Sequence, residues 1–326
     1  MSLANDKSVD LSIVIVSYNT KELTRHCLEC VKKFAEDISY EVLVIDNASI
    51  DGSADMVAEE FSWVTLIRLS ANRGFAGGNI PGMKNASGKY ILLLNSDAFL
   101  SEGILHKTIS FMDRHHKIGI LGCRLINSDG TFQPSARMLP SPLNKILQIT
   151  GLAAHFPKSR FLGRADLTWW DHSVPRSVGW VVGAFFLIRR KTMEELGFLD
   201  DRYFLYFEEV DYCLTAKRAG WEVVFYPHAH VVHLAGQSAA KSGQDITEHG
   251  KQIKAVRIAS EFRYYRKLYG WFYVLLSASI EYLWCACIIT RNLCKRSARA
   301  RIKRREAIDT MQTIVATLTN DNWGKI

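Results

Sequence analysis

The sequence lacks the features by which several protein classes are usually identified. It has seven cysteines in 326 residues, and their scattered positions do not form the disulfide framework of a secreted protein. Cys27 and Cys30 form a CxxC pair at helical spacing, but no second pair follows that could complete a zinc site. The first ten residues, MSLANDKSVD, are polar, so we expect no signal peptide. These absences favour a protein of the reducing cytosol.

Acidic residues are missing from one stretch near the C-terminal end. Residues 291–305 (RNLCKRSARARIKRR) contain eight Lys or Arg and no Asp or Glu. The other 33 basic residues balance the 33 acidic ones, so the formal net charge of +8 resides in this segment. A basic surface spread over the fold is not indicated, which argues against nucleic acid as a partner.

Two common phosphate-binding motifs are absent or misplaced. The P-loop sequence GxxxxGK[ST] does not occur. A glycine-rich stretch, NRGFAGGN at 72–79, follows the third expected strand, whereas a dinucleotide-binding fingerprint directly follows the first strand. The sequence therefore argues against a P-loop NTPase and against a nicotinamide-dependent enzyme.

The chain does contain a regular alternation of apolar runs and helical segments. The runs predict buried strands at 11–17, 40–46, 64–69 and 90–94. Strands that alternate with helices predict an α/β fold, with a mostly parallel sheet covered on both faces. In such sheets ligands bind outside the carboxyl ends of the strands.

Polar residues stand at the carboxyl ends of three expected strands. One such tip could be only a turn, because Asn, Ser and Asp favour turns. Three tips at one edge of a sheet indicate a ligand-binding crevice instead. The residues are Ser17, Tyr18 and Asn19 after the first strand, Asp46 and Asn47 after the second, and Asn95, Ser96 and Asp97 after the fourth.

Seven motifs follow one another between about residues 11 and 238: SIVIVSYNT, VLVIDNASIDGS, NRGFAGGN, ILLLNSDA, GAFFLIRR, GFLDDRYFLYFEEVDYC and HLAGQS. In this order they resemble the family 2 glycosyltransferases with a GT-A fold, and more narrowly their bacterial rhamnosyltransferase-like branch. The resemblance implies a GT-A catalytic domain at 1–238. Beyond it we expect a helical connector at 239–267 and a hydrophobic helix with a basic tail at 268–326.

The resemblance also implies a divalent metal, Mg²⁺ or Mn²⁺, at the tip of the fourth strand. Asn95-Ser96-Asp97 stands where other members have Asp-x-Asp, so Asp97 is expected to hold the metal that bridges the donor diphosphate. One carboxylate cannot hold such an ion alone, and His233 matches the family's metal-binding histidine. His228 and His230 are weaker candidates on the same expected strand.

The nucleotide is expected over the first two strand ends. Asp46 could accept a hydrogen bond from the ring N–H of uracil or thymine, and Asn47 could pair through its amide. Alternatively, residues 46–51 form only a capped turn, with Ser49 or Asp51 capping the next helix. The full set of candidate nucleotide contacts is Ser17, Tyr18, Asn19, Asp46, Asn47, Arg73, Asn95 and Ser96.

The acidic cluster FEEVDYC (207–213) supplies the candidate general base. In an inverting transfer the acceptor hydroxyl displaces the leaving group in one step, and a carboxylate within reach takes its proton. The family's pattern places this base at Glu209, where Asp is commoner. Glu208 and Asp211 would then contact the acceptor or support the fold. The alternative is that the three acids only interact favourably with a helix dipole.

Residues 268–290 form an apolar stretch with one charge, Glu281. It is long enough to span a membrane, although a packed helix or an in-plane interfacial helix fits as well. A single span would place the basic residues 291–305 opposite the catalytic domain, against the positive-inside tendency. We therefore expect peripheral or in-plane attachment to an anionic membrane surface, at the cytoplasmic face of a bacterial inner membrane.

Together these features predict an inverting glycosyltransferase that uses a nucleoside diphosphate sugar donor. The expected donor is dTDP-rhamnose, and the expected acceptor is a cell-surface glycan or a lipid-linked saccharide. A UDP-hexose or UDP-galactofuranose donor is the alternative on the same fold. Because one acid of Asp-x-Asp is missing, a non-catalytic sugar-nucleotide-binding scaffold is a third possibility.

Overall fold

The structure, a computed structural model, describes residues 9–35, 38–234 and 246–320. These residues group into two compact units that interleave along the chain. The sheet unit comprises the described residues within 1–137, 172–201 and 208–243, and the helical unit those within 138–171, 202–207 and 244–326. The expected boundary at residue 238 lies outside the described residues, as does the end of the HLAGQS motif.

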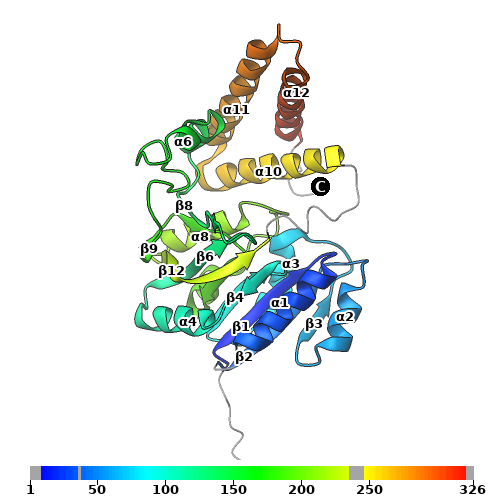
Figure 1. The fold of residues 1–326 in the computed structure, drawn as a ribbon, viewed down its shortest axis with the longest axis vertical. Coiled ribbons are helices and arrows are strands. Elements are labelled where there is room, and N and C mark those ends of the chain that lie inside the picture. The colour runs from blue at the N-terminus through cyan, green and yellow to red at the C-terminus, as the bar shows by residue number, and fades with distance from the viewer. Residues whose placement is uncertain (1–8, 36–37, 235–245, 321–326) are drawn as a thin grey trace, which may run out of the picture. The chain divides into compact units, whose positions relative to one another are not determined.

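The sheet unit alternates strands and helices over most of its length, as the sequence predicts (Figure 1). Its elements in chain order are β1 (Leu11–Ser17), α1 (Lys21–Phe34), β2 (Tyr40–Asp46), α2 (Ser53–Glu60), β3 (Thr65–Arg68), α3 (Gly74–Asn85), β4 (Tyr90–Asn95), β5 (Ala98–Leu100), α4 (Ile104–Arg114), β6 (Ile118–Ile126), β7 (Phe132–Gln133), β8 (Ala136–Arg137), β9 (Arg176–Ser177), β10 (Trp180–Val181), β11 (Phe185–Arg189), α7 (Arg190–Leu196), α8 (Glu208–Arg218) and β12 (Glu222–His233).

The main sheet has the strand order β3-β2-β1-β4-β11-β6-β12-β5. Strands β1 to β4 run parallel, and β6 runs parallel to β12. Strand β11 lies antiparallel between β4 and β6, and the short β5 is antiparallel to β12. The predicted α/β fold with a mostly parallel sheet is confirmed.

Alternating side chains of β1 bury both faces of the sheet. Leu11, Ile13 and Ile15 join a core cluster with residues of α1 and α2. On the other face, a Cβ at Gly82 of α3 would lie 2.4 Å from Val14 Cγ1. The glycines of α3 therefore let this helix pack directly on the strands, because side chains of successive strand residues point to opposite faces.

The helical unit contains α5 (Pro142–Ile149), α6 (Leu152–His155), α10 (Ile246–Tyr269), α11 (Trp271–Asn292) and α12 (Ala298–Thr319). The apolar stretch expected at 268–290 is divided at Gly270, whose φ of +84° favours glycine. Helix α11 is, within the described part of the chain, the one helix long and apolar enough to cross a membrane by length and composition, with a mean hydropathy of 1.8.

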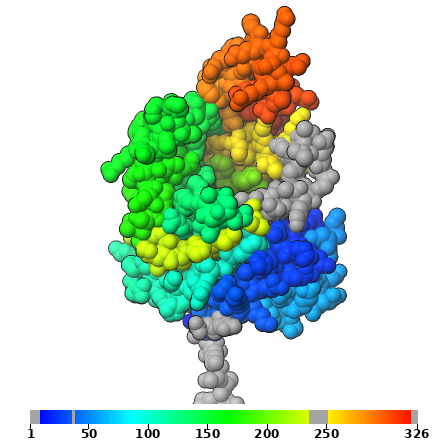
Figure 2. Space-filling model, in the orientation of Figure 1, coloured from blue at the N-terminus to red at the C-terminus, as the bar shows by residue number. Residues whose placement is uncertain are grey.

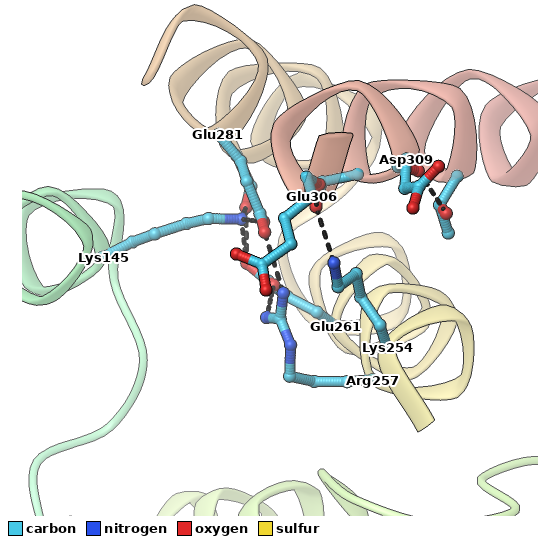
Figure 3. A network of polar contacts seen from close by, with 10 residues as sticks. Lys145, Lys254, Arg257, Glu261, Glu281, Glu306 and Asp309 are labelled. Atoms are coloured by element: carbon cyan, nitrogen blue, oxygen red, sulfur yellow. Dashed lines mark hydrogen bonds and ion pairs between the residues drawn. The ribbon is translucent and has the colours of Figure 1, made fainter. Parts of the chain in front are cut away.

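A buried charge network joins three helices of this unit (Figure 3). Lys145 of α5 forms ion pairs with Glu281 of α11 at 2.7 Å and with Glu261 of α10 at 2.8 Å. Arg257 of α10 pairs with Glu281 at 2.8 Å. Burial acts to raise the pKa of Glu281, but Lys145 and Arg257 outweigh it and hold that pKa below its usual range. The only charge in the apolar stretch is thus neutralised inside the protein.

Replacing Glu281 should unfold this unit more easily. Glu281→Ala leaves the buried Lys145 and the half-buried Arg257 to share Glu261, so we expect a loss of up to about 3–5 kcal/mol in the free energy of unfolding. Urea unfolding followed by tryptophan fluorescence measures it. Asp309→Ala, which removes a surface ion pair with Lys251 at 3.6 Å, is the matched control and should cost less than about 1 kcal/mol.

The stability difference between wild type and Glu281→Ala should depend on pH. The folded pKa of Glu281 is depressed, so its stabilisation is complete above the unfolded value of about 4.3 and is lost as the pH falls through the folded value. Wild type and Glu281→Ala should therefore converge in stability at low pH. A difference that persists undiminished in acid would contradict the ion-pair explanation.

Candidate functional site

The parallel register brings the polar strand tips to one edge of the sheet. Ser17 lies opposite Asp46, and Val16 lies opposite Asn95. Asp46 is also paired with Arg68, the last residue of β3. Arg68 was not among the residues predicted for the site, although an arginine near the carboxyl end of an expected strand is a candidate ligand contact.

Asp46 lines a pocket at this edge. The residue is 4% exposed; its Oδ2 accepts from the Ser49 amide at 3.1 Å, while Oδ1 is buried with no hydrogen-bond partner among the described residues. A buried acceptor without a donor is costly, so this atom suits a ligand N–H. The pocket holds about 420 Å³ and is lined by Asp46, Ala48, Ser49, Ile50, Gly52, Ala54, Asp55, Arg68 and Leu69.

Asn19 fastens the loop that borders this pocket. Its Oδ1 accepts from the backbone amide of Ile50 at 2.9 Å, and its backbone N–H donates to Ser49 Oγ at 3.1 Å. Tyr18, beside it, is half-buried. Helix α2 begins after Gly52 without a side-chain cap, but Asp51 accepts from the Ser53 amide at 3.0 Å. The turn is therefore built by side-chain bonds within the loop and from Asn19.

Other candidate nucleotide contacts use their polar atoms inside the protein. The hydroxyls of Ser17 and Ser96 are joined through Thr20, at 3.2 and 3.1 Å, in a buried cluster that ties β1 to β4. The Asn47 amide nitrogen donates to Gly74 O at 3.0 Å, and its oxygen accepts from the amide of Arg73 at 2.8 Å. The Arg73 side chain itself is exposed at the start of α3.

Asp97 and His233 form a close pair although they are far apart in sequence. The antiparallel register of β12 with β5 places His233 opposite Ala98, the residue after Asp97. His233 Nε2 lies 3.4 Å from Asp97 Oδ1 and 3.4 Å from the amide nitrogen of Asn95. Asp97 and His233 are 4% and 8% exposed. The structure thus brings together the two residues that the sequence assigns to a metal.

This pair fits a Mg²⁺ or Mn²⁺ ion that shares its coordination with a ligand. Among the residues that the structure describes, no third His, Cys, Asp or Glu completes a cluster. Mg²⁺ commonly takes one or two protein ligands and fills its other positions with phosphate oxygens and water. His228 and His230 are both exposed on β12 and lie outside the pair.

The acidic residues of FEEVDYC begin helix α8. The backbone turns sharply just before them, because Tyr206 and Phe207 have φ values of +68° and +69°. Glu208 is 3% exposed, and Glu209 is partly exposed, with Oε2 of each buried and without a hydrogen-bond partner among the described residues. Asp211 is buried in the same first turn.

Burial raises the pKa values of the two glutamates to different extents. It raises the pKa of Glu208 well above the usual range, with the charge of Glu209 adding to the effect. Burial also raises the pKa of Glu209 to about 7, while Arg137, which the sequence reasoning missed, acts in the opposite direction. Burial therefore favours the protonated form of Glu208, whereas Glu209 can both accept and release a proton near pH 7.

Comparison with known proteins supports the fold and the family. Residues 12–214 match the family described as Glycosyl transferase family 2. An N-acetylglucosaminyl-diphospho-decaprenol L-rhamnosyltransferase of Mycobacterium tuberculosis is 27% identical over 250 residues, covering 73% of this chain and 80% of its own length. A low-salt glycan biosynthesis hexosyltransferase, Agl10 of Haloferax volcanii, is 22% identical over 64% of this chain and 62% of its own length.

Two solved structures share the fold at low sequence identity. A mannosyltransferase from Pyrobaculum calidifontis, in complex with GDP-Man and Mn²⁺, has a TM-score of 0.53 at 14% identity and covers 98% of this chain and 91% of its own. GalNAc-T7 with UDP, GalNAc and Mn²⁺ has a TM-score of 0.57 at 14% identity, covering 97% and 57%. Because the family match spans more than half of the sequence, the chain belongs to glycosyltransferase family 2.

Proposed function

We propose that this glycosyltransferase is an inverting enzyme that transfers rhamnose from dTDP-rhamnose to a lipid-linked saccharide. The observation that carries the donor class is the convergence of Asp46, Asp97 and His233 at one sheet edge. The sugar and the acceptor are suggested by the mycobacterial rhamnosyltransferase, whose name gives a diphospho-decaprenol acceptor.

Each group at the site then has one task. The buried Oδ1 of Asp46 accepts a hydrogen bond from the ring N–H of thymine. Asp97 and His233 would hold a divalent metal, which would supply positive charge next to the departing diphosphate. Glu209 takes the proton of the acceptor hydroxyl while that oxygen bonds to the anomeric carbon and the bond to the diphosphate oxygen breaks.

Asp97→Asn tests the metal assignment. The change keeps the shape of the side chain and removes its charge. We expect Mn²⁺ affinity, measured by electron paramagnetic resonance, to fall by more than the roughly 10–100-fold typical of losing an outer-shell partner. Metal-dependent binding of dTDP-rhamnose should fall with it, while the thermal unfolding temperature stays near that of wild type.

Asp113 of α4 provides a matched control, because its contacts lie at the amino end of β4, whereas Asp97 follows the carboxyl end of that strand. Asp113 accepts hydrogen bonds from Lys89 and Tyr90, so Asp113→Asn should leave metal and donor binding unchanged. Unaltered Mn²⁺ affinity in Asp97→Asn would refute the assignment. Binding of donor without any turnover by the wild type would instead favour a non-catalytic scaffold.

Glu209→Gln tests the general base. Donor binding should survive, while turnover falls by roughly 10²–10⁴-fold because no acceptor for the proton remains. In the wild type, turnover should decline as the pH drops below about 7, since the carboxylate must be deprotonated and its pKa is about 7. Initial rates from pH 5 to 9 measure this.

Glu208→Gln is the control for this experiment. Because burial favours the protonated form of Glu208, the amide resembles the native side chain, and we expect a much smaller effect on turnover. A dead Glu208→Gln enzyme together with an active Glu209→Gln enzyme would show that the base is assigned to the wrong residue.

A second donor class has one observation in its favour. The Haloferax relative is named a hexosyltransferase, and an acceptor atom at Asp46 suits uracil as well as thymine. A panel of dTDP-rhamnose, UDP-glucose, UDP-galactofuranose and GDP-mannose, each with and without Mn²⁺, distinguishes them by thermal shift. Stabilisation by a UDP-sugar alone would replace rhamnose with a hexose in the proposal.

A further inference from the structure

Helix α11 has its polarity reversed relative to a surface helix of a water-soluble protein. Its charged Glu281 is only 8% exposed, together with Val274, Ser277, Ala278 and Cys285 on the buried face. Its exposed side chains include five large apolar ones: Phe272 at 71%, Leu283 at 64%, Leu275 at 53%, Trp271 at 42% and Tyr282 at 39%. Surface helices normally place the charged residue outside and the apolar ones inside.

The exposed apolar residues form one stripe. Phe272, Leu275 and Leu283 recur at spacings of three and eight residues, with the exposed Ser279 between them, and so lie on one side of the helix. Glu281 and Val274 lie on the opposite side, against α5, α10 and α12. The space-filling view shows the orange surface of α11 and of the residues after it uncovered (Figure 2).

The basic segment 291–305 runs from the last turn of α11 into the first two turns of α12. Seven of its eight cations are exposed. The eighth, Arg304, donates to carbonyl oxygens at the end of α11, including Lys295 O at 3.1 Å. Arg304 thus ties the start of α12 to the end of α11, and the other seven cations of the segment are exposed.

We infer that the outer face of α11 and the basic segment bind the surface of an anionic lipid bilayer, with α11 lying in its plane. Aromatic and aliphatic side chains would enter the headgroup region, and the cations would meet anionic headgroups. A second copy of the chain is a poorer occupant, because a symmetric contact would bring two sets of eight cations together.

The charge network explains why the helix lies on the bilayer. Glu281 is held by Lys145 and Arg257, which belong to α5 and α10. A span across the bilayer would separate Glu281 from these partners and bury its charge in hydrocarbon, which is strongly unfavourable. Retaining the pairs keeps α11 against its neighbours and leaves only the stripe for lipid.

Co-sedimentation with phosphatidylcholine vesicles, with or without phosphatidylglycerol, tests the surface without donor or metal. Leu275→Gln combined with Leu283→Gln should weaken binding to anionic vesicles by on the order of tenfold or more. Phe161→Gln, which changes an apolar residue of the same unit that is 57% exposed, is the control and should bind like wild type. All of these side chains are exposed, so unfolding temperatures should be unchanged.

The electrostatic part has its own variant. Lys295→Gln with Arg296→Gln should reduce binding to anionic vesicles by about 25-fold, at about fivefold for each charge, and leave binding to neutral vesicles unaltered. Lys32→Gln with Lys33→Gln, an exposed pair in α1, is the matched control. Failure of the full chain to bind anionic vesicles would overturn the inference. Membrane-bound protein that resists carbonate extraction would also overturn it, because it would indicate a spanning helix. So would a dimer that forms without lipid and dissociates in the Leu275→Gln, Leu283→Gln variant.

A second inference concerns the imidazole of His233 and rests on the proposed metal role. His233 Nδ1 lies 2.7 Å from Gln133 Oε1. The Gln133 amide nitrogen donates to Asn127 Oδ1 at 3.1 Å, and the Asn127 amide nitrogen donates to Thr131 Oγ1 at 2.9 Å. The Thr131 hydroxyl donates in turn to Asp129 at 2.6 Å.

The carboxylate of Asp129 fixes the direction of every bond in this chain. It can only accept, so the Thr131 hydroxyl must donate to it and accept from Asn127. The Asn127 oxygen is then the acceptor for Gln133, and the Gln133 oxygen faces His233. The structure assigns Gln133 as a positioning residue that keeps the proton of His233 on Nδ1, so that Nε2 offers a lone pair beside Asp97. Outer-shell partners commonly orient metal-binding histidines in this way.

The tautomer of His233 can be read in the metal-free protein by nitrogen-15 nuclear magnetic resonance, at a pH where the ring is neutral. Wild type should carry the proton on Nδ1. Gln133→Met removes the acceptor and should shift the population toward the Nε2–H form, whereas Gln133→Glu keeps an acceptor oxygen and should retain the native tautomer. A His233→Asn spectrum assigns the signal.

Mn²⁺ affinity is the second readout. It should fall by roughly 10–100-fold in Gln133→Met and be restored in Gln133→Glu. An unchanged tautomer in Gln133→Met would overturn the positioning role. A shifted tautomer in a protein whose wild type binds no Mn²⁺ would support the positioning role and refute the metal assignment of the proposed function.

Discussion

The antiparallel pairing of β12 with β5 is the interaction on which the site depends. It sets His233 opposite Ala98 and therefore beside Asp97. A slip of one residue would turn His233 to the other face of the sheet. The register of β12 against β6 changes between Tyr226 and His230, where the sequence reads YPHAH. This irregularity resets the strand before it reaches β5 and leaves His228 and His230 outside the pair.

Polar groups at the strand tips divide into two sets. Ser17, Ser96 and Asn47 satisfy their hydrogen bonds inside the protein and hold strand ends and loops together. Asp46 Oδ1 and Glu209 Oε2 are buried acceptors with no partner among the described residues. Each such group costs about 1–3 kcal/mol. On the proposed function, a ring N–H of the donor base completes Asp46 and the acceptor hydroxyl completes Glu209.

Features that depend on residues close together in the sequence were predictable. The apolar runs gave the strands, and the polar tips followed from the rule that ligands bind at the carboxyl ends of parallel strands. Gly270 could have been predicted to end a helix, but the continuous apolar run led us to expect one stretch over 268–290. The partners of Glu281 and the chain of bonds behind His233 could not be predicted, because they join residues that only tertiary packing brings together. Arg137 near Glu209 belongs to the same class.

The net charge of the chain is concentrated in the helical unit. Lys145, Arg257, Glu261 and Glu281 form a neutral set inside the helical unit. The net charge of +8 therefore resides in residues 291–305, next to the apolar stripe. The rest of the chain is balanced, so its attraction to an anionic surface is confined to one segment. On the proposed function, donor binding then relies on local groups such as Asp46, Asp97 and His233, because the balanced charge of the remaining chain supplies no general positive field.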